Sequence, residues 1–430
     1  MKNSPRLFSP RQWILISACF VLLSISGGMN FNFGIFIKPF ADEFQWSRSV
    51  ISAGYSIYMG MLALSAVLLG GLADRYGARP VVLAGALIYG VSLLLSSRIQ
   101  SLWEFYLLAG VVAGLGRGSF MVPINAFLQR TFTRNRGLAT GLAGAGTGAG
   151  ILFFSPLTGY LIAALGWRWT YLVLGLLLLA MGIPMALLLR APARERRKIP
   201  PGKGEAAKPP AQAESDPLPE AALGMRAILR RLPFWTISGS HTFDCLCHSV
   251  LIVHLVPFAI ESGIPKIQAA ALLGALGVGA FLGRVLMGVL SDRVGAKRAL
   301  FVTLLLQTLP IPLLLWTASL PAFALISLTV GLGMGGHGTM YPLVTREYYG
   351  PRRVGLLLGA FSTGASLGMA GGAFMGGLLH DITGDYRLSF LFSFTVGVIS
   401  LFMVWAYPER RLPRRGPAER AGGALPLEAG

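Results

Sequence analysis

Long apolar stretches, separated by short polar loops, run along almost the whole chain. Each is roughly 20 to 28 residues long, which at about 1.5 Å per residue covers a hydrocarbon layer about 30 Å thick. The pattern therefore predicts twelve transmembrane helices, over about residues 13–37, 48–73, 79–98, 103–129, 137–165, 168–189, 233–260, 267–291, 299–318, 321–345, 354–380 and 387–407.

The polar loops carry a repeat. DRYGAR at residues 74–79 returns 218 positions later as DRVGAK at residues 292–297, each time at the end of an apolar stretch. The same offset pairs glycines of the two halves: Gly137 with Gly355, Gly141 with Gly359 and Gly166 with Gly384, among others. Duplicated halves of this size are typical of transporters. We expect an all-α membrane protein with two pseudo-symmetric six-helix bundles.

Composition agrees with a lipid-embedded chain and excludes a soluble protein with one core. Of 430 residues, 54% are hydrophobic and 13% are charged, and the mean hydropathy is +0.63. The formal charge of +19 comes mainly from Lys and Arg in loops that are cytoplasmic if both termini lie inside. This asymmetry follows the positive-inside rule. We expect a multi-pass protein of a cell membrane, the inner membrane of a bacterium, with both termini cytoplasmic and no nucleic-acid partner.

The apolar pattern stops once in the middle of the chain and again near its end. Residues 191–231, rich in Arg and Pro, predict a largely disordered cytoplasmic linker, and residues 409–430 predict a disordered cytoplasmic tail. The two bundles are then residues 1–190 and 232–408. Cysteines occur only inside apolar stretches, which predicts neither a disulfide framework nor a redox pair. We expect a monomer.

The repeated loops GGLADRYGAR and GVLSDRVGAK resemble the loop signature of the major facilitator superfamily. In that family the aspartate caps or pairs near a helix end, and arginines bind carbonyl and carboxylate groups of the neighbouring helix. The resemblance implies the twelve-helix fold of the family. It also implies gating roles for Asp74, Arg75, Arg79, Asp292, Arg293 and Lys297.

Three longer segments, residues 31–52, 134–150 and 272–293, resemble the branch of monocarboxylate transporters and oxalate/formate antiporters. In that branch an arginine on the eighth helix binds the substrate carboxylate, and Arg284 is the matching position. Two features of the branch are missing: an aspartate found four residues before that arginine is Ala280 here, and no lysine stands near Leu367. Coupling and substrate therefore do not carry over from the resemblance alone.

Few ionisable groups lie inside the predicted helices, and such groups are expected to face a cavity or one another. Arg284 and Asp244 fall at similar depths, roughly 12 Å and 16 Å from the cytoplasmic end of their helices. The fork of a guanidinium matches a carboxylate, so Arg284 is predicted to bind an organic anion. The alternative is a permanent ion pair between Arg284 and Asp244 that only joins two helices.

The seventh predicted helix places His241, Asp244 and His248 on one face. Imidazole titrates near neutrality, so this face is a candidate proton relay. Helix packing is an equal alternative. Zinc binding is a weaker one, because nothing else in the sequence supplies a cluster to complete a metal shell. We expect no metal site and no cofactor. His254, in the outer half of the same helix, is a further candidate for proton coupling.

A second arginine, Arg117, is expected in the middle of the fourth helix, where it either contacts substrate or braces a carbonyl. A second cation in the site favours a dicarboxylate or an aromatic acid. His337 and Tyr341 on the tenth helix are candidate donors to a bound anion, and Phe281 and Phe361 are candidates for the apolar wall.

The sequence as a whole predicts a secondary transporter rather than an enzyme. Its partners are expected to be a small organic anion, most simply a monocarboxylate, a symported proton and the lipid bilayer. One competing hypothesis is an exporter of drugs or neutral solutes in which Arg284 and Asp244 form a structural pair. Another is a membrane sensor or intramembrane metal enzyme that uses the histidine face.

Overall fold

The computed structural model describes residues 7–30, 32–190 and 224–407, and every regular element within them is a helix. The first half contains α1 (Pro10–Asn30), α2 (Phe33–Phe44), α3 (Arg48–Tyr76), α4 (Ala78–Ser96), α5 (Leu102–Phe105), the π-helical η1 (Tyr106–Val112), α6 (Ala113–Thr131) and α7 (Arg136–Leu188). The second half contains α9 (Met225–Leu229), α10 (Leu232–Glu261), α11 (Lys266–Val294), α12 (Ala296–Thr308), the 3-10 helix η2 (Ile311–Trp316), α13 (Leu320–Tyr349), α14 (Val354–Thr383) and α15 (Arg387–Trp405).

Most of the predicted linker, residues 191–223, and the whole predicted tail, residues 409–430, lie outside the described residues. The end of the linker does contain α9, whose Ile228 is buried.

The predicted number of membrane helices is confirmed. Eleven helices in the described part are long and apolar enough to cross a membrane. One of them, α7, has 53 residues and contains two predicted spans, because Gly166 adopts φ 80 and ψ 167 in its middle. A backbone with positive φ and extended ψ interrupts the helix, and glycine adopts it without steric cost. Gly384, the partner of Gly166 in the repeat, ends α14 with φ 76.

One predicted boundary is wrong. The first apolar stretch was expected to form a single helix to about residue 37, but α1 ends at Asn30 and a separate α2 follows. Asn32 lies between them, buried, and its amide donates to Thr158 Oγ1 at 2.6 Å. The apolar run continues through this junction, so hydrophobicity alone gave no sign of the break.

The far end of α2 is fastened to α7 by a carboxylate. Glu43 accepts hydrogen bonds from Trp167 and Arg168. Burial acts to raise the pKa of Glu43, but the hydrogen bonds from Arg168 and Trp167 and the charge of Arg168 outweigh it and lower the pKa. Glu43 therefore stays ionised and keeps α2 on the end of its bundle.

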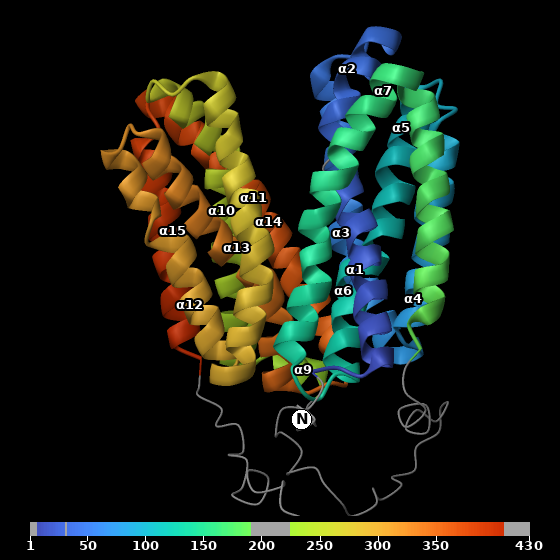
Figure 1. Ribbon diagram of the computed structural model, residues 1–430, viewed down its shortest axis with the longest axis vertical. Helices are drawn as coiled ribbons and strands as arrows, with labels where there is room; N and C mark the ends of the chain where they lie inside the picture. The colour runs from blue at the N-terminus through green and yellow to red at the C-terminus, as the bar shows by residue number, and fades with distance from the viewer. Residues whose placement is uncertain (1–6, 31, 191–223, 408–430) are drawn as a thin grey trace, which may run out of the picture.

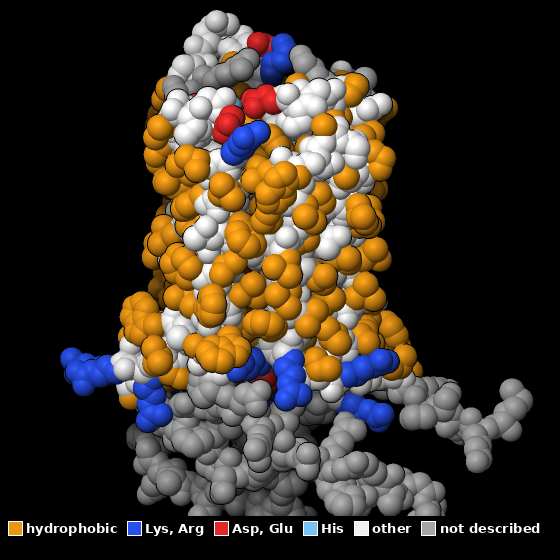
Figure 2. Space-filling model, turned by 90° about the vertical axis from the view of Figure 1, so that its left-hand side faces the viewer, with side chains coloured by type: hydrophobic (Ala, Val, Ile, Leu, Met, Phe, Trp, Pro, Cys, Tyr) orange, Lys and Arg blue, Asp and Glu red, His pale blue; other side chains and the backbone are white. Residues whose placement is uncertain are grey.

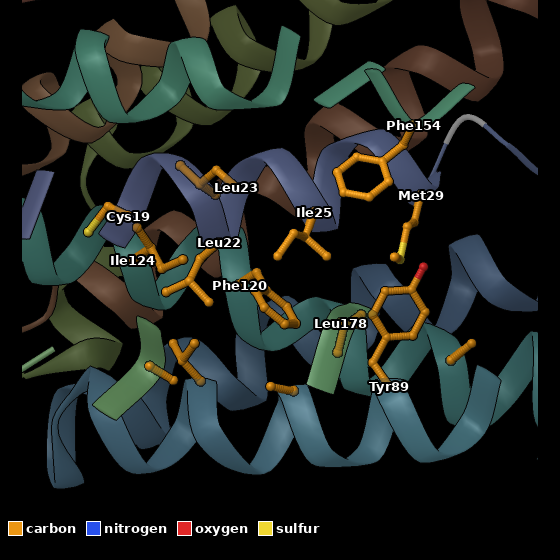
Figure 3. Packing of buried hydrophobic residues seen from close by; sticks show 14 of the residues in the cluster. Cys19, Leu22, Leu23, Ile25, Met29, Tyr89, Phe120, Ile124, Phe154 and Leu178 are labelled. Atoms are coloured by element: carbon orange, nitrogen blue, oxygen red, sulfur yellow. The ribbon is translucent and has the colours of Figure 1, made fainter. Parts of the chain in front are cut away.

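The surface has the character of a membrane protein. Apolar side chains cover the face shown in Figure 2 between two polar ends, and Lys and Arg side chains gather along the lower end in this view. Inside the first bundle, α1, α4, α6 and α7 pack around apolar side chains such as Leu22, Phe120 and Leu178, all three fully buried (Figure 3). Cys19 lies in the same core.

The two bundles meet at one end and diverge toward the end that carries α2 (Figure 1). Two seams join them, α3 against α14 and α11 against α7. In the first, Gly70 and Gly355 approach so closely that a Cβ on either would overlap the carbonyl oxygen of the other. In the second, Gly288 and Gly137 do the same. The offset of 218 relates Gly70 to Gly288 and Gly137 to Gly355, so the two seams are copies of one contact.

Repeated aspartates lock both seams. Asp74 accepts the backbone N–H groups of Gly355 and Leu356 at 2.9 and 2.8 Å, at the start of α14. Asp292 accepts those of Gly137 and Leu138 at 2.8 and 2.9 Å, at the start of α7. A carboxylate in this position satisfies helix N–H groups that have no partner within the helix, and it interacts favourably with the helix dipole. Each aspartate thus fixes one bundle to a helix of the other.

Enlarging a seam glycine is expected to separate the bundles at this end. The side chain of Gly137→Leu would collide with the backbone of α11, so the distance between spin labels at Thr133 and Arg352, both exposed, should lengthen in electron-electron resonance measurements. The native cysteines are buried and do not interfere with labelling. Gly159→Leu, in the same helix with open space at its Cβ, is the matched control. An unchanged distance in Gly137→Leu would contradict the assignment of the seam.

Candidate functional site

Arg284 lies on α11 directly at the second seam. Its carbonyl oxygen is the atom that a Cβ on Gly141 of α7 would overlap, which is the same kind of close approach as at Gly137. Its guanidinium extends along the glycine face of α7: a Cβ on Gly144 would lie 3.5 Å from Arg284 Cδ, and one on Gly148 would lie 3.4 Å from Nη1. The cation of one bundle is therefore in contact with a helix of the other.

The guanidinium of Arg284 is half-buried, and none of its nitrogens forms a hydrogen bond or ion pair with any part of the chain that the structure describes. A partly desolvated cation of this kind needs an acceptor, because guanidinium donors removed from water are costly unless they are paired. Five N–H donors in a planar fork suit a carboxylate best.

Asp244 is not that acceptor. The carboxylate of Asp244, with no exposed surface, accepts a hydrogen bond on Oδ1 from Gln307 of α12, whose amide also donates to the Asp244 carbonyl at 3.3 Å. Its Oδ2 lies 3.7 Å from Nδ1 of His337 on α13. The permanent ion pair between Arg284 and Asp244 that the sequence allowed is not formed.

The histidine face of α10 packs onto α13. The ring of His241 stacks on Tyr341 at 3.9 Å between centroids, and the ring of His248 stacks on His337 at 4.9 Å. With Asp244 and Gln307, these residues form one polar cluster between α10, α12 and α13, which we call the histidine cluster. His337 was expected to face substrate, but it joins this cluster and keeps 14% of its side chain exposed. Two residues further along α13, Thr339 donates from Oγ1 to the carbonyl oxygen of Arg284 at 3.5 Å.

Three other expected site residues make their contacts within the second bundle. Tyr341 is buried and its hydroxyl donates to Ser240 Oγ at 3.2 Å. Phe361 is fully buried in the core of the second bundle, 5.3 Å from Phe234. His254, about 9 Å along α10 from His248, packs on α14 with Nε2 3.0 Å from the carbonyl oxygen of Ala373.

Phe281 and Arg117 keep positions compatible with a site. Phe281 is half-buried one turn before Arg284, and a Cβ on Gly148 would lie 3.9 Å from it. Arg117 on α6 is half-buried and donates from Nε to the Ser26 carbonyl of α1 at 3.2 Å. It therefore braces a carbonyl through one nitrogen, and its two terminal nitrogens have no partner within the described ranges.

Only some of the predicted gating residues make contacts between the two bundles. Asp74 and Asp292 bind helix starts across the seams, and Lys297 donates to the carbonyls of Trp405 and Tyr407 within its own bundle. Arg75 lies over the ring of its neighbour Tyr76 at 5.2 Å. Arg79 and Arg293 form no hydrogen bond or ion pair with described residues.

Arg130 also joins the bundles, which the sequence did not indicate. It pairs with Asp74 and donates from Nε to the carbonyl of Pro351 at 2.9 Å and from Nη2 to that of Arg352 at 3.3 Å. Arg130 is the second-last residue of α6 and lies outside the repeated motif. Its role is therefore visible only from its contacts in the folded structure.

Comparison with known proteins agrees with the duplicated helical architecture. The family model described as Major Facilitator Superfamily matches residues 19–345 and 238–429. The chain belongs to this superfamily. Among curated relatives, monocarboxylate transporter 13 of Bos taurus is 27% identical over 382 residues, covering 88% of this chain and 85% of that protein. Monocarboxylate transporter 11 of Homo sapiens is 29% identical over 423 residues, covering 94% and 84%.

Solved structures of the superfamily share the fold. The transporter FucP in its outward conformation superposes with a TM-score of 0.70 at 14% identity, covering 93% of this chain and all of that one. The proton:xylose symporter XylE, bound to 6-bromo-6-deoxy-D-glucose, gives a TM-score of 0.70 at 12% identity, with 92% and 95% covered. At such identities the likeness concerns the fold alone.

The absence of an Arg284–Asp244 pair in this superfamily member is testable by a double-mutant cycle. We expect the effects of Arg284→Gln and Asp244→Asn on the free energy of unfolding to add within about 0.5 kcal/mol, because the two side chains form no hydrogen bond or ion pair with each other. The pair Asp244→Asn and Gln307→Leu is the positive control and should show coupling above about 0.5 kcal/mol. Coupling of about 3 kcal/mol between Arg284 and Asp244, the size typical of a buried ion pair, would restore the structural-pair hypothesis.

Proposed function

We propose that this chain is a secondary active transporter that binds the carboxylate of a small organic anion, a monocarboxylate, at Arg284. The observation that carries the proposal is the half-buried guanidinium at the seam between bundles, with no acceptor among the described residues. The names of the curated relatives, monocarboxylate transporters 11 and 13, support this substrate class.

The location of Arg284 suits alternating access. Its backbone belongs to the seam and its guanidinium lies on α7 of the opposite bundle, so rocking of the bundles changes what surrounds the cation. Because Gly144 and Gly148 carry no side chains, the Arg284 side chain can lie against this part of α7. In the proposed orientation both termini are cytoplasmic, in a bacterial inner membrane, and the monomer is the transporting unit.

A dicarboxylate or aromatic acid is the second candidate substrate. The observation that favours it is the pair of unpartnered terminal nitrogens on Arg117, a second half-buried cation. Because the Nε of Arg117 is occupied by a carbonyl, we assign the primary carboxylate to Arg284.

We also propose that a proton accompanies the anion. A carboxylate and a proton cross together without net charge, which avoids moving a charge against the membrane potential. The histidine cluster supplies protonatable groups beside the site: Asp244 and His337 are 3.7 Å apart, and His241 and His248 stack on the same helix. His254 is too far along α10 to share this position.

The competing hypotheses have less support. An exporter with a structural Arg284–Asp244 pair requires a contact that is not formed. A sensor or intramembrane enzyme has no counterpart among the family and relatives reported above, which are transporters.

Replacing the cation should abolish transport. In proteoliposomes, Arg284→Ala is expected to reduce saturable uptake of radiolabelled monocarboxylates about a hundredfold, since about 3 kcal/mol of charge-assisted binding is lost. Arg284→Lys should also fail, because an ammonium lacks the fork of a guanidinium. Arg98→Lys, at an exposed position, is the control and should transport normally. Undiminished uptake of every tested acid by Arg284→Ala would refute the assignment.

Coupling can be separated from binding by comparing two modes of transport. An inward proton gradient should stimulate uptake by the native protein. Asp244→Asn should lose that stimulation while still exchanging labelled for unlabelled acid, because only the proton carrier is removed. His254→Gln is the matched control on the same helix and should respond as the native protein does. Gradient-driven uptake that persists in Asp244→Asn would place the proton elsewhere.

A further inference from the structure

The histidine cluster leaves several buried polar atoms unsatisfied. Asp244 Oδ2, His241 Nδ1, His248 Nδ1, His337 Nδ1 and Gln307 Oε1 all lack a hydrogen-bond partner within the described part of the chain. Each such atom costs about 1–3 kcal/mol when nothing binds it, and native proteins contain few of them. Three of these five residues, Asp244, His248 and His337, are candidate metal ligands, so a bound ion would use side chains that otherwise have unsatisfied atoms.

The structure brings together a set of metal ligands that the sequence did not indicate. Four potential ligand atoms, from Asp244, Cys245, His248 and His337, all lie within 4.8 Å of one another. Three of the residues come from α10 and the fourth, His337, comes from α13. Tetrahedral zinc, with bonds of about 2.0–2.3 Å, holds its ligands about 3.3–3.8 Å apart. Side-chain rotations that move each atom inward by less than about 1 Å would close the shell.

We propose that Asp244, Cys245, His248 and His337 form a binding site for a zinc-class divalent metal ion. Binding releases the thiol proton of Cys245, so the ligands are one carboxylate, one thiolate and two neutral imidazoles. Their two negative charges balance the ion, and the assembled site is neutral, as a low-dielectric interior requires. The amide of Gln307 already holds Oδ1 of Asp244 and leaves Oδ2 for the metal.

The chemistry of the ligands also sets the selectivity. A thiolate with two imidazoles favours zinc, cobalt and similar ions over magnesium and calcium, which prefer oxygen ligands. His337, with 14% of its side chain exposed, is the only one of the four outside the fully buried class, so it marks the side from which an ion enters. Metal and protons would compete for the same atoms, so an occupied site clamps α10 to α13 and inhibits proton-coupled transport.

Cobalt reports both the binding and the geometry of the site. We would purify the full chain with a chelator, remove the chelator and titrate Co²⁺ in detergent. The partly exposed His380, whose Nε2 lies 3.3 Å from a carboxylate oxygen of exposed Glu261, would be changed in all samples to asparagine (His380→Asn) to remove a weak surface site. The proposal predicts one Co²⁺ per chain, intense visible absorption typical of a tetrahedral ion, and a near-ultraviolet band from sulfur-to-cobalt charge transfer.

Two variants and one control assign the ligands. Cys245→Ser should lose the charge-transfer band, and His337→Gln should weaken binding by about 10- to 100-fold. Cys247→Ser, a buried cysteine two residues away but outside the four-ligand set, should keep both. Zn²⁺ should displace the cobalt and bleach the colour. If Cys245→Ser does not elute as a folded protein, Cys245→Ala takes its place with the same criterion.

Either of two results would overturn the proposal: no binding at micromolar Co²⁺, or a spectrum that Cys245→Ser and His337→Gln leave unchanged. The binding test does not involve transport, so it stands or fails separately from the proposed anion carrier.

Discussion

Contact between glycine backbones at one end of the molecule is the constraint on which the rest of the structure depends. Gly137 and Gly288 on one side, and Gly70 and Gly355 on the other, bring helices of the two bundles so close that no Cβ fits. Such contacts let membrane helices associate without a hydrophobic driving force. The aspartates at 74 and 292 then bind the helix starts that the glycines bring within reach.

The same seam positions the cation. Arg284 and Ala66 are equivalent in the repeat, and each offers its carbonyl to a glycine across the seam, Gly141 and Gly359 respectively. The two halves differ in what the side chain adds: a methyl group on one side and a guanidinium on the other. The proposed site is therefore an asymmetric feature of a symmetric scaffold, as expected when a site is built at the interface of duplicated halves.

Much of this architecture was predictable because it follows from periodic or repeated patterns in the sequence. Apolar stretches gave the twelve helices, and the offset between the DRYGAR and DRVGAK loops gave the paired seams. The break near Asn32 was missed because the apolar run continues through it. Contacts between unrelated positions were also hidden. Arg130 reaches Asp74 from outside the motif, Gln307 reaches Asp244 from α12, and His337 joins α10 from α13. None of these pairings has a fixed spacing along the chain, so a single sequence cannot show them.

The central claim is that the guanidinium of Arg284 receives the carboxylate of the cargo, and nitrogen NMR of the arginine side chains tests it most directly. With ¹⁵N-arginine incorporated and Arg284→Lys used to assign its signal, the account predicts that a saturating monocarboxylate shifts the Arg284 resonances while those of Arg130, already paired with Asp74, stay in place. Arg284 resonances that do not move at concentrations where the acid is bound would contradict it.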